Sequence, residues 1–438
     1  MAMSASSCDP ESSKQRSGET AILSRLTGVL GPGLVTGASD DDPSGIATYS
    51  QAGAQFGFGI TWTLLFTYPL MAAIQEISAR AGRTTGRGIA ANLRQHYPTW
   101  IPQGVVSLLL IANMINIGSD LGAMGDAAAQ LVGGPKSLFV ILFAIVCTTL
   151  QVLVQYSRYV AVLKWTTLSL FAYFGTVLVV DVPWGEVARG LFILRFTAQL
   201  DFWTMVVAIF GTTISPYLFF WQASEEVEEI ADVTARKPLL RSPRQGPDAI
   251  RRIKTDTYVG MAFSNLVGLA IMITAAATLH AAGNTSIQTS AQAAEALKPV
   301  AGELAFVIFS LGIMGTGFLA VPVLAGSAAY AVGEAFGWPV GLARKPLQAK
   351  GFYATIVIAT LSGTIICFSP LDPIRALFWS AVINGVVAVP VMVMMMLMTS
   401  SESVMGKFVV TGMLRWVGWI ATLAMGAAAA GMGIAAML

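Results

Sequence analysis

The chain has 438 residues, of which 55% are hydrophobic and 11% are charged, and its formal net charge is +2. A soluble domain carries about 25% charged residues, so this composition is typical of a membrane protein. The small net charge gives no support for a nucleic-acid partner, and no nucleophile–base constellation or cofactor motif favours an enzyme. The three cysteines (Cys8, Cys147 and Cys367) have no metal-ligand spacing. We therefore predict no bound cofactor.

The first 25 residues are rich in Ser, Glu, Lys and Arg and contain no apolar run. We predict a disordered cytoplasmic tail over residues 1–25, and not a signal peptide. A bilayer core of about 30 Å requires roughly 20 apolar residues per helix. Eleven segments are apolar enough: 27–56, 59–79, 103–132, 137–154, 160–180, 202–222, 255–282, 302–334, 351–368, 373–398 and 413–436. The sequence thus predicts an all-α membrane protein with eleven transmembrane helices.

Lys and Arg are concentrated in alternate connections between these segments. One set includes the charged stretch 223–254, which we predict to be a cytoplasmic loop, with the glutamate run at 225–229 forming a solvated helix end. The opposite set carries only Lys136, Arg189, Arg195, Lys298 and Arg375. Because cytoplasmic loops carry the excess of basic residues, we predict a cytoplasmic N-terminus and an external C-terminus. The protein is then a multi-pass protein of a bacterial-type inner (plasma) membrane.

The first apolar segment is interrupted in its middle by Asp40, Asp41, Asp42 and Pro43. Proline cannot continue the hydrogen-bond ladder of a helix. Three carboxylates at membrane depth would each cost roughly 2.5 kcal/mol or more unless something offsets them. Such a stretch is tolerated where unwound backbone lines a cavity, so we predict a broken helix beside a cation site.

The sixth apolar segment has a similar interruption, the stretch 211–217, which begins with Gly211 and contains Pro216. Segments one and six begin two five-helix halves, residues 26–182 and 183–400, and residues 401–438 form an eleventh helix. Paired broken helices at matching positions of inverted repeats mark a binding site near the bilayer midplane. The simpler alternative is two proline kinks without a ligand, but the acidic triplet favours a cation site.

At these residues the sequence resembles the Nramp family of divalent metal transporters, which have the LeuT-type 5+5 inverted-repeat fold with helices 1 and 6 broken. The matching stretches are Gly31 through Gly45, Ser78 through Pro98, and Ser215-Pro216-Tyr217, where the family has Met-Pro-His. The resemblance covers about the first hundred residues and the surroundings of segment six. Beyond residue 260 it is mainly hydropathy.

The resemblance implies a metal site, because family members bind Mn²⁺ or Fe²⁺ with an Asp, an Asn, a Met sulfur and backbone carbonyls. Asp42 keeps the Asp, Gly45 takes the Asn position, and Ser215 takes the Met position. The candidate metal-binding residues are Asp42, Asp41, Ser39, Gly45, Thr212, Ser215, Tyr217 and Asn384. We expect Asp42 to be the first ligand, Asp41 a direct or water-mediated partner, and the carbonyls near Ser39 and Thr212 further ligands. Asn384 faces either the site or a neighbouring helix.

The missing sulfur bears on which ion is transported. A thioether selects soft transition metals, whereas carboxylate, hydroxyl, carbonyl and water oxygens suit Mg²⁺, Ca²⁺ or Mn²⁺. Mg²⁺ usually keeps several waters and is held by one or two carboxylates. The pattern resembles the Nramp-related magnesium transporter branch. We predict a monomeric carrier of hard divalent cations, Mg²⁺ first and Mn²⁺ second, working by alternating access.

Proton coupling is the second departure from the family. Tyr217 stands where the family has a histidine, and a tyrosine hydroxyl keeps its proton at neutral pH. Asp120 matches a family Asp and is a candidate proton or gating residue, although it could simply pair with Arg375. We expect transport without obligatory proton coupling. The alternatives are a proton-coupled importer of Mn²⁺ or other transition metals, and an ion-coupled organic solute carrier of the same fold.

Overall fold

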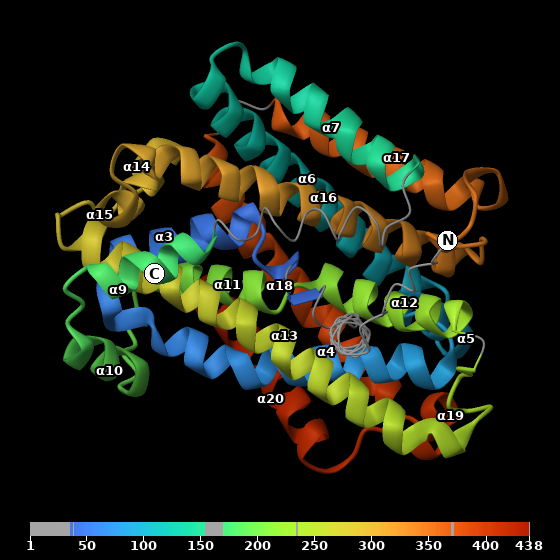
Figure 1. Cartoon of the computed structure of the whole chain (residues 1–438). Helices are drawn as coiled ribbons and strands as arrows, with labels where there is room; N and C mark the ends of the chain where they lie inside the picture. Colours follow the sequence, from blue (N-terminus) through green and yellow to red (C-terminus); the bar gives the residue numbers. More distant parts are fainter. Residues whose placement is uncertain (1–35, 38, 154–169, 234, 369–371, 438) are drawn as a thin grey trace, which may run out of the picture.

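The computed structural model describes residues 36–437 apart from 38, 154–169, 234 and 369–371. The described residues form helices and connecting turns, with no strand among them. Long helices run side by side across the molecule, and shorter ones lie at the two ends of the bundle (Figure 1). This confirms the predicted all-α fold.

Twelve of the described helices follow the apolar segments of the sequence. They are α3 (Pro43–Phe56), α4 (Trp62–Thr85), α6 (Trp100–Val132), α7 (Lys136–Leu153), α9 (Phe171–Val179), α11 (Leu200–Thr213), α12 (Pro216–Asp232), α13 (Gly246–Ala275), α16 (Ala305–Phe336), α17 (Lys350–Cys367), α18 (Pro373–Thr399) and α20 (Gly412–Ala435). The connections contain α5 (Ile89–His96), α10 (Trp184–Phe192), α14 (Ser290–Ala294), α15 (Lys298–Ala301) and α19 (Glu402–Met405). Each predicted segment coincides with a described helix over at least part of its length.

The predicted number of eleven membrane spans is not confirmed. Among the described residues, eight helical stretches are long and apolar enough to cross a membrane. A ninth candidate consists of Pro43–Ile60, which is α3 with the short 3₁₀ turn Gly57–Ile60 that follows it, and α4; the two parts are bent by 108° relative to each other. The predicted spans 27–56, 137–154 and 160–180 lie partly outside the described residues, and the tail 1–25 lies wholly outside them.

Glycines allow the helices at the centre of the bundle to approach closely. α11 packs on α18 and α20, α12 packs on α4, and α6 packs on α16, α17 and α18. At the α11–α18 crossing, a Cβ added to Gly211 would lie only 2.0 Å from the carbonyl oxygen of Ala381. The same crossing holds Gly385 against Val207. Small residues of this kind let helix backbones approach closely within a membrane.

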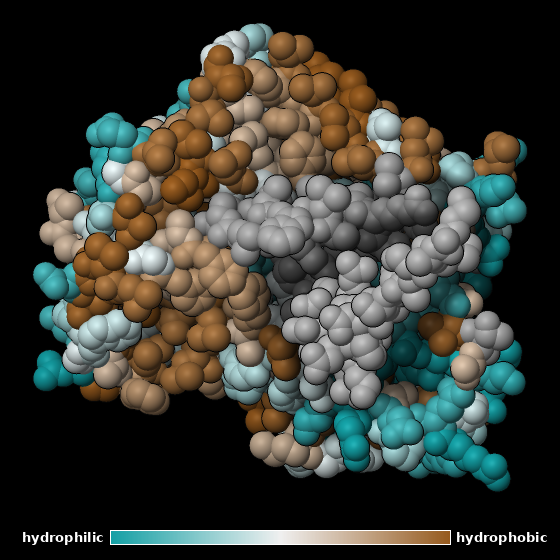
Figure 2. Space-filling view, viewed as in Figure 1, coloured by the Kyte–Doolittle hydropathy of each residue, from teal (hydrophilic) through white to brown (hydrophobic). Residues whose placement is uncertain are grey.

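The outer surface is apolar over the helices and polar at the helix ends. Brown, apolar residues cover the upper part of the molecule, and teal residues gather at its left and right edges (Figure 2). On α7, Leu138, Ile141, Leu142 and Ile145 are all exposed, as expected for a helix facing lipid. The connection 337–349, which carries Arg344 and Lys345, and the connection 400–411, which contains α19 and carries Lys407, lie at one end of the bundle with α5 (Figure 1).

The expected loop 223–254 is mostly helical. α12 continues to Asp232 and α13 begins at Gly246, so the non-helical connection is much shorter than predicted. The glutamate run at 225–229 is also not a solvated helix end. Glu226 is fully buried, and Arg252 of α13 donates to its carboxylate at 2.6 Å. Arg252 also pairs with Glu229 at 2.8 Å, so these charges join α12 to α13.

Candidate metal-binding site

The first helix interruption lies at Asp41 and Asp42, between a helical turn that includes Ser39 and Asp40 and the start of α3. Asp42 is the N-cap of α3, and Pro43 occupies the first helical position. Both residue types are favoured there, because a carboxylate accepts from free amides and proline has no amide to leave unpaired. The Oδ1 atom of Asp42 accepts from the Gly45 amide at 2.7 Å and from the Ser44 hydroxyl at 2.6 Å.

The second interruption is shorter than the sequence predicts. α11 continues through Gly211 to Thr213 and α12 begins at Pro216, so only Ile214 and Ser215 are non-helical. The Ser215 hydroxyl donates to the carbonyl oxygens of Gly211 at 2.6 Å and Thr212 at 3.0 Å. It therefore satisfies carbonyl groups that the helix end leaves free.

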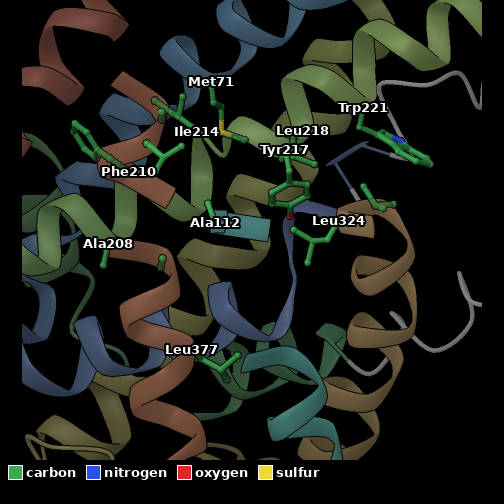
Figure 3. Close-up of a cluster of buried hydrophobic side chains, with 14 of the residues drawn as sticks. Met71, Ala112, Ala208, Phe210, Ile214, Tyr217, Leu218, Trp221, Leu324 and Leu377 are labelled. Atoms are coloured by element: carbon green, nitrogen blue, oxygen red, sulfur yellow. The ribbon is translucent and has the colours of Figure 1, made fainter. Parts of the chain in front are cut away.

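The two interruptions meet in the protein interior. The Tyr217 hydroxyl donates to the Ser39 carbonyl oxygen at 3.1 Å and lies 3.5 Å from Oδ2 of Asp42. A Cβ added to Gly45 would lie 3.1 Å from the Thr212 hydroxyl oxygen, so Gly45 faces α11. Figure 3 shows the Tyr217 ring among apolar side chains, including Leu324 of α16 and Leu218 of its own helix. The structure thus brings together six predicted residues: Ser39, Asp42, Gly45, Thr212, Ser215 and Tyr217.

Asp40 and Asp41 are directed toward α13. The Ser264 hydroxyl lies 2.6 Å from Oδ2 of Asp40 and 3.2 Å from Oδ1 of Asp41. All three side chains are at most 2% exposed. Ser264 was not predicted from the sequence, because a serine within an apolar helix gives no distinguishing signal.

Asn116 of α6 is the second residue that the sequence analysis missed. Its Nδ2 atom donates to Oδ2 of Asp42 at 3.2 Å, and its side chain is completely buried. The available signal was its spacing, since Asn113, Asn116 and Asp120 recur at helical intervals and share one face of α6. Asn113 itself donates to Leu324 and Ser327 of α16.

Asp120 and Asn384 are both buried, at 0% and 1% exposure. Among the described residues, neither carboxylate oxygen of Asp120 and neither amide atom of Asn384 has a hydrogen-bond partner. The suggested pairing of Asp120 with Arg375 is wrong, because Arg375 is exposed and lies 3.7 Å from Asp372. Asn384 lies on α18, next to the Gly385 that packs against α11.

No basic side chain forms an ion pair with the aspartates of the site within the described part of the chain. The ion pairs found there join Arg80 to Glu76, Arg236 to Glu229, Arg252 to Glu226 and Glu229, Lys298 to Glu295, and Arg375 to Asp372. None includes the buried Asp40, Asp41, Asp42 or Asp120. Buried charges are normally paired or coordinate metals. No group of three His, Cys, Asp or Glu side chains converges among these residues, so a metal held here would also need hydroxyl, amide, carbonyl or water oxygens.

Comparisons with known proteins agree with this arrangement. The sequence profile described as "Natural resistance-associated macrophage protein-like", that of the Nramp family, matches residues 33–435. The chain belongs to the Nramp family. Members of this family are membrane transporters and not enzymes. The match covers both interruptions and extends far beyond the first hundred residues in which the motifs are recognisable.

Individual relatives match this family member at low sequence identity but over most of its length. A "Divalent metal cation transporter MntH" of Klebsiella pneumoniae subsp. pneumoniae is 27% identical over 401 residues, covering 89% of this chain and 90% of the relative. The solved structure of a manganese transporter of Eremococcus coleocola has a TM-score of 0.73 at 16% identity, covering 93% of this chain and 86% of that one. Mhp1, a nucleobase-cation-symport-1 family transporter, has a TM-score of 0.54 at 14% identity, covering 93% of both chains. These likenesses confirm the LeuT-type fold.

Proposed function

We propose that this chain is a membrane transporter of hard divalent metal cations that carries Mg²⁺ in preference to Mn²⁺. The observation that carries the proposal is the meeting of two helix interruptions at the buried carboxylate of Asp42. Its relatives include a protein named as a divalent metal cation transporter and one named as a manganese transporter. An organic solute carrier is less well supported, because the four buried aspartates would repel a substrate carboxylate.

The preference for Mg²⁺ rests on the chemistry of the groups around Asp42. Those groups offer carboxylate, amide, hydroxyl and carbonyl oxygens, and Ser215 stands where the family has a methionine. Oxygen ligands suit Mg²⁺ and Mn²⁺, and the loss of a thioether removes a feature that favours softer metals. Gly45 does not supply the amide oxygen that the family's asparagine supplies, and Mg²⁺, which usually retains several waters, needs fewer protein ligands than a dehydrated ion.

Transport then proceeds by alternating access, with the helices on either side of the two interruptions rearranging around the ion. Entry does not need protons. An inward-negative membrane potential contributes about 4.6 kcal/mol per 100 mV to the entry of a divalent cation. Tyr217 replaces the family histidine, which removes one proton carrier from the site.

Proton-coupled uptake of Mn²⁺ is the second candidate function, and one observation favours it. The Asp120 carboxylate is fully buried with no hydrogen-bond partner among the described residues. An isolated carboxylate within a membrane helix is characteristic of proton relays. Acidification of the vesicle lumen in step with metal uptake would support this candidate over uncoupled transport.

The first test is uptake into proteoliposomes with Mg²⁺ and Mn²⁺ supplied separately and in competition. We expect Mg²⁺ uptake in the wild type and a loss of at least about tenfold in Asp42→Asn. This substitution keeps an oxygen that can accept from Gly45, so the cap of α3 is retained while the charge is removed. A buried contact to a charged group contributes about 1.5–3 kcal/mol, which corresponds to roughly tenfold or more.

The matched control is Asp372→Asn, because Asp372 is an exposed carboxylate outside the site. It should transport as well as the wild type. Mn²⁺ uptake that excess Mg²⁺ fails to inhibit would refute the Mg²⁺ preference. Full activity of Asp42→Asn would refute the site itself.

A further inference from the structure

Asn116 occupies a distinctive place beside the most constrained carboxylate of the site. The Oδ1 atom of Asp42 already accepts two hydrogen bonds, from Gly45 and Ser44. Its Oδ2 atom is held less firmly, by Asn116 at 3.2 Å and by Tyr217 at 3.5 Å. Oδ2 is therefore the oxygen of Asp42 with more remaining capacity to bind a cation.

The other end of the Asn116 amide is unused. Its Oδ1 atom is buried and accepts no hydrogen bond from any described residue. A buried acceptor without a donor lowers the stability of the fold by about 1–3 kcal/mol. Binding of a cation to this oxygen would offset that cost. A cation held by Oδ2 of Asp42 would lie close to the Asn116 amide.

The donor in the present arrangement cannot remain next to a bound cation, since the hydrogens of Nδ2 carry positive charge. A rotation of about 180° around the last side-chain bond exchanges the amide nitrogen and oxygen. Asparagine can thus donate to an empty carboxylate and present an acceptor to a metal from the same position. Neither aspartate nor leucine can serve in both states.

We propose that Asn116 is a ligand of the transported divalent cation and exchanges its hydrogen bond to Asp42 for coordination through its amide oxygen. This rests on the proposed function, and it names a ligand from α6 in addition to those of the two interrupted helices. The amide oxygen that Gly45 cannot supply from α3 is then supplied by α6. When the ion leaves, the amide returns to donate to Oδ2 and stabilises the empty carboxylate.

The test compares Asn116→Leu, Asn116→Asp and wild type in the full-length protein. Binding of Mg²⁺ and of Mn²⁺ is measured by titration calorimetry, and uptake of each ion is measured in proteoliposomes. Leucine has a similar size but neither donates nor accepts, so we expect affinity for the transported ion to fall by about tenfold or more. Aspartate keeps an acceptor and adds a charge, so we expect KM to fall and kcat to fall with it, because ion release leaves two adjacent carboxylates.

Ser119→Ala is the matched control on the same helix. The Ser119 hydroxyl donates to Ile115 and Ala376 and does not contact Asp42, so this variant should bind and transport like the wild type. Wild-type affinity in Asn116→Leu would overturn the inference, while a loss in Asp42→Asn would still support the proposed function. Weakened binding in both Asn116 variants would mean that the amide acts only as a donor and would also overturn it. If the wild type binds Mn²⁺ but not Mg²⁺, and Asn116→Leu lowers the affinity for Mn²⁺ by tenfold, Asn116 is supported as a ligand and the preference for Mg²⁺ is refuted.

Discussion

At the scale of single residues, the aspartates of the acidic triplet lie in two different environments. Asp42 caps α3 and contacts α6 and α12, whereas Asp40 and Asp41 both face Ser264 on α13. Unwound backbone has no helical periodicity, so these directions could not be derived from the sequence. The assignment of Asp41 as a metal partner remains a prediction, since its carboxylate contacts the Ser264 hydroxyl of α13.

The absence of a side chain at Gly45 can be tested directly. In Gly45→Asn the new Cβ would lie 3.1 Å from the Thr212 hydroxyl and 3.4 Å from the Asp40 carbonyl oxygen, so the Thr212 side chain must shift slightly. The new amide oxygen would then compete with water as a ligand of the ion. We expect Mg²⁺ uptake to fall by roughly tenfold and Mn²⁺ uptake to fall less, because Mg²⁺ dehydrates more reluctantly. Competition assays in proteoliposomes measure the ratio of Mg²⁺ uptake to Mn²⁺ uptake.

Gly433→Asn serves as the control for that substitution, since no atom lies within 4 Å of a Cβ there. It should leave both ion fluxes unchanged. An equal loss of Mg²⁺ and Mn²⁺ uptake in Gly45→Asn would show that the waters retained by the ion do not decide selectivity.

At the scale of elements, the two interruptions differ in extent. α11 and α12 are separated by two residues only, and the Ser215 hydroxyl closes the end of α11. The sequence predicted the position of this break from Pro216 but overestimated its length, because glycine and threonine in 211–213 are held helical by packing. Gly211 in particular contacts the backbone of α18.

The α11–α18 contact gives a prediction about stability. In Gly211→Ala the added Cβ would lie 2.0 Å from the Ala381 carbonyl oxygen, so the two backbones must separate. Overpacking of this kind costs about 1–3 kcal/mol, and we expect a lower thermal unfolding temperature in detergent. Gly104→Ala in α6 adds a Cβ in open space and should not lower it. If both variants unfold at the wild-type temperature, the contact does not contribute to stability.

At the scale of the whole molecule, the described connections 337–349 and 400–411, which carry Arg344, Lys345 and Lys407, lie at one end of the bundle with α5 (Figure 1). The opposite end carries α10, α14 and α15. This separation is what the distribution of Lys and Arg predicts for a protein that crosses a membrane. The assignment of the basic end to the cytoplasm, and with it the external C-terminus, remains a prediction, as do the two repeats 26–182 and 183–400 and the monomeric state.

Single cysteines would test the orientation in a background without Cys8, Cys147 and Cys367. Ser286 lies in the connection between α13 and α14, and Ser403 lies in α19; both are exposed. We expect a membrane-impermeant maleimide to label Ser286→Cys in intact cells and to label Ser403→Cys only after permeabilisation. The reverse pattern would invert the topology.

The sequence by itself determined the helical architecture and the place of the site. Hydropathy is a local property, so each predicted apolar segment coincides with a helix, and proline with acidic residues in an apolar run locates each break. The tertiary structure decided which side chains meet there. Asp42 and Asn116 are 74 residues apart, and Asp40 and Ser264 are 224 apart. Such pairs form only when helices pack, which is also why the glutamates of α12 are paired with Arg252 and why Asp120 is not paired with Arg375.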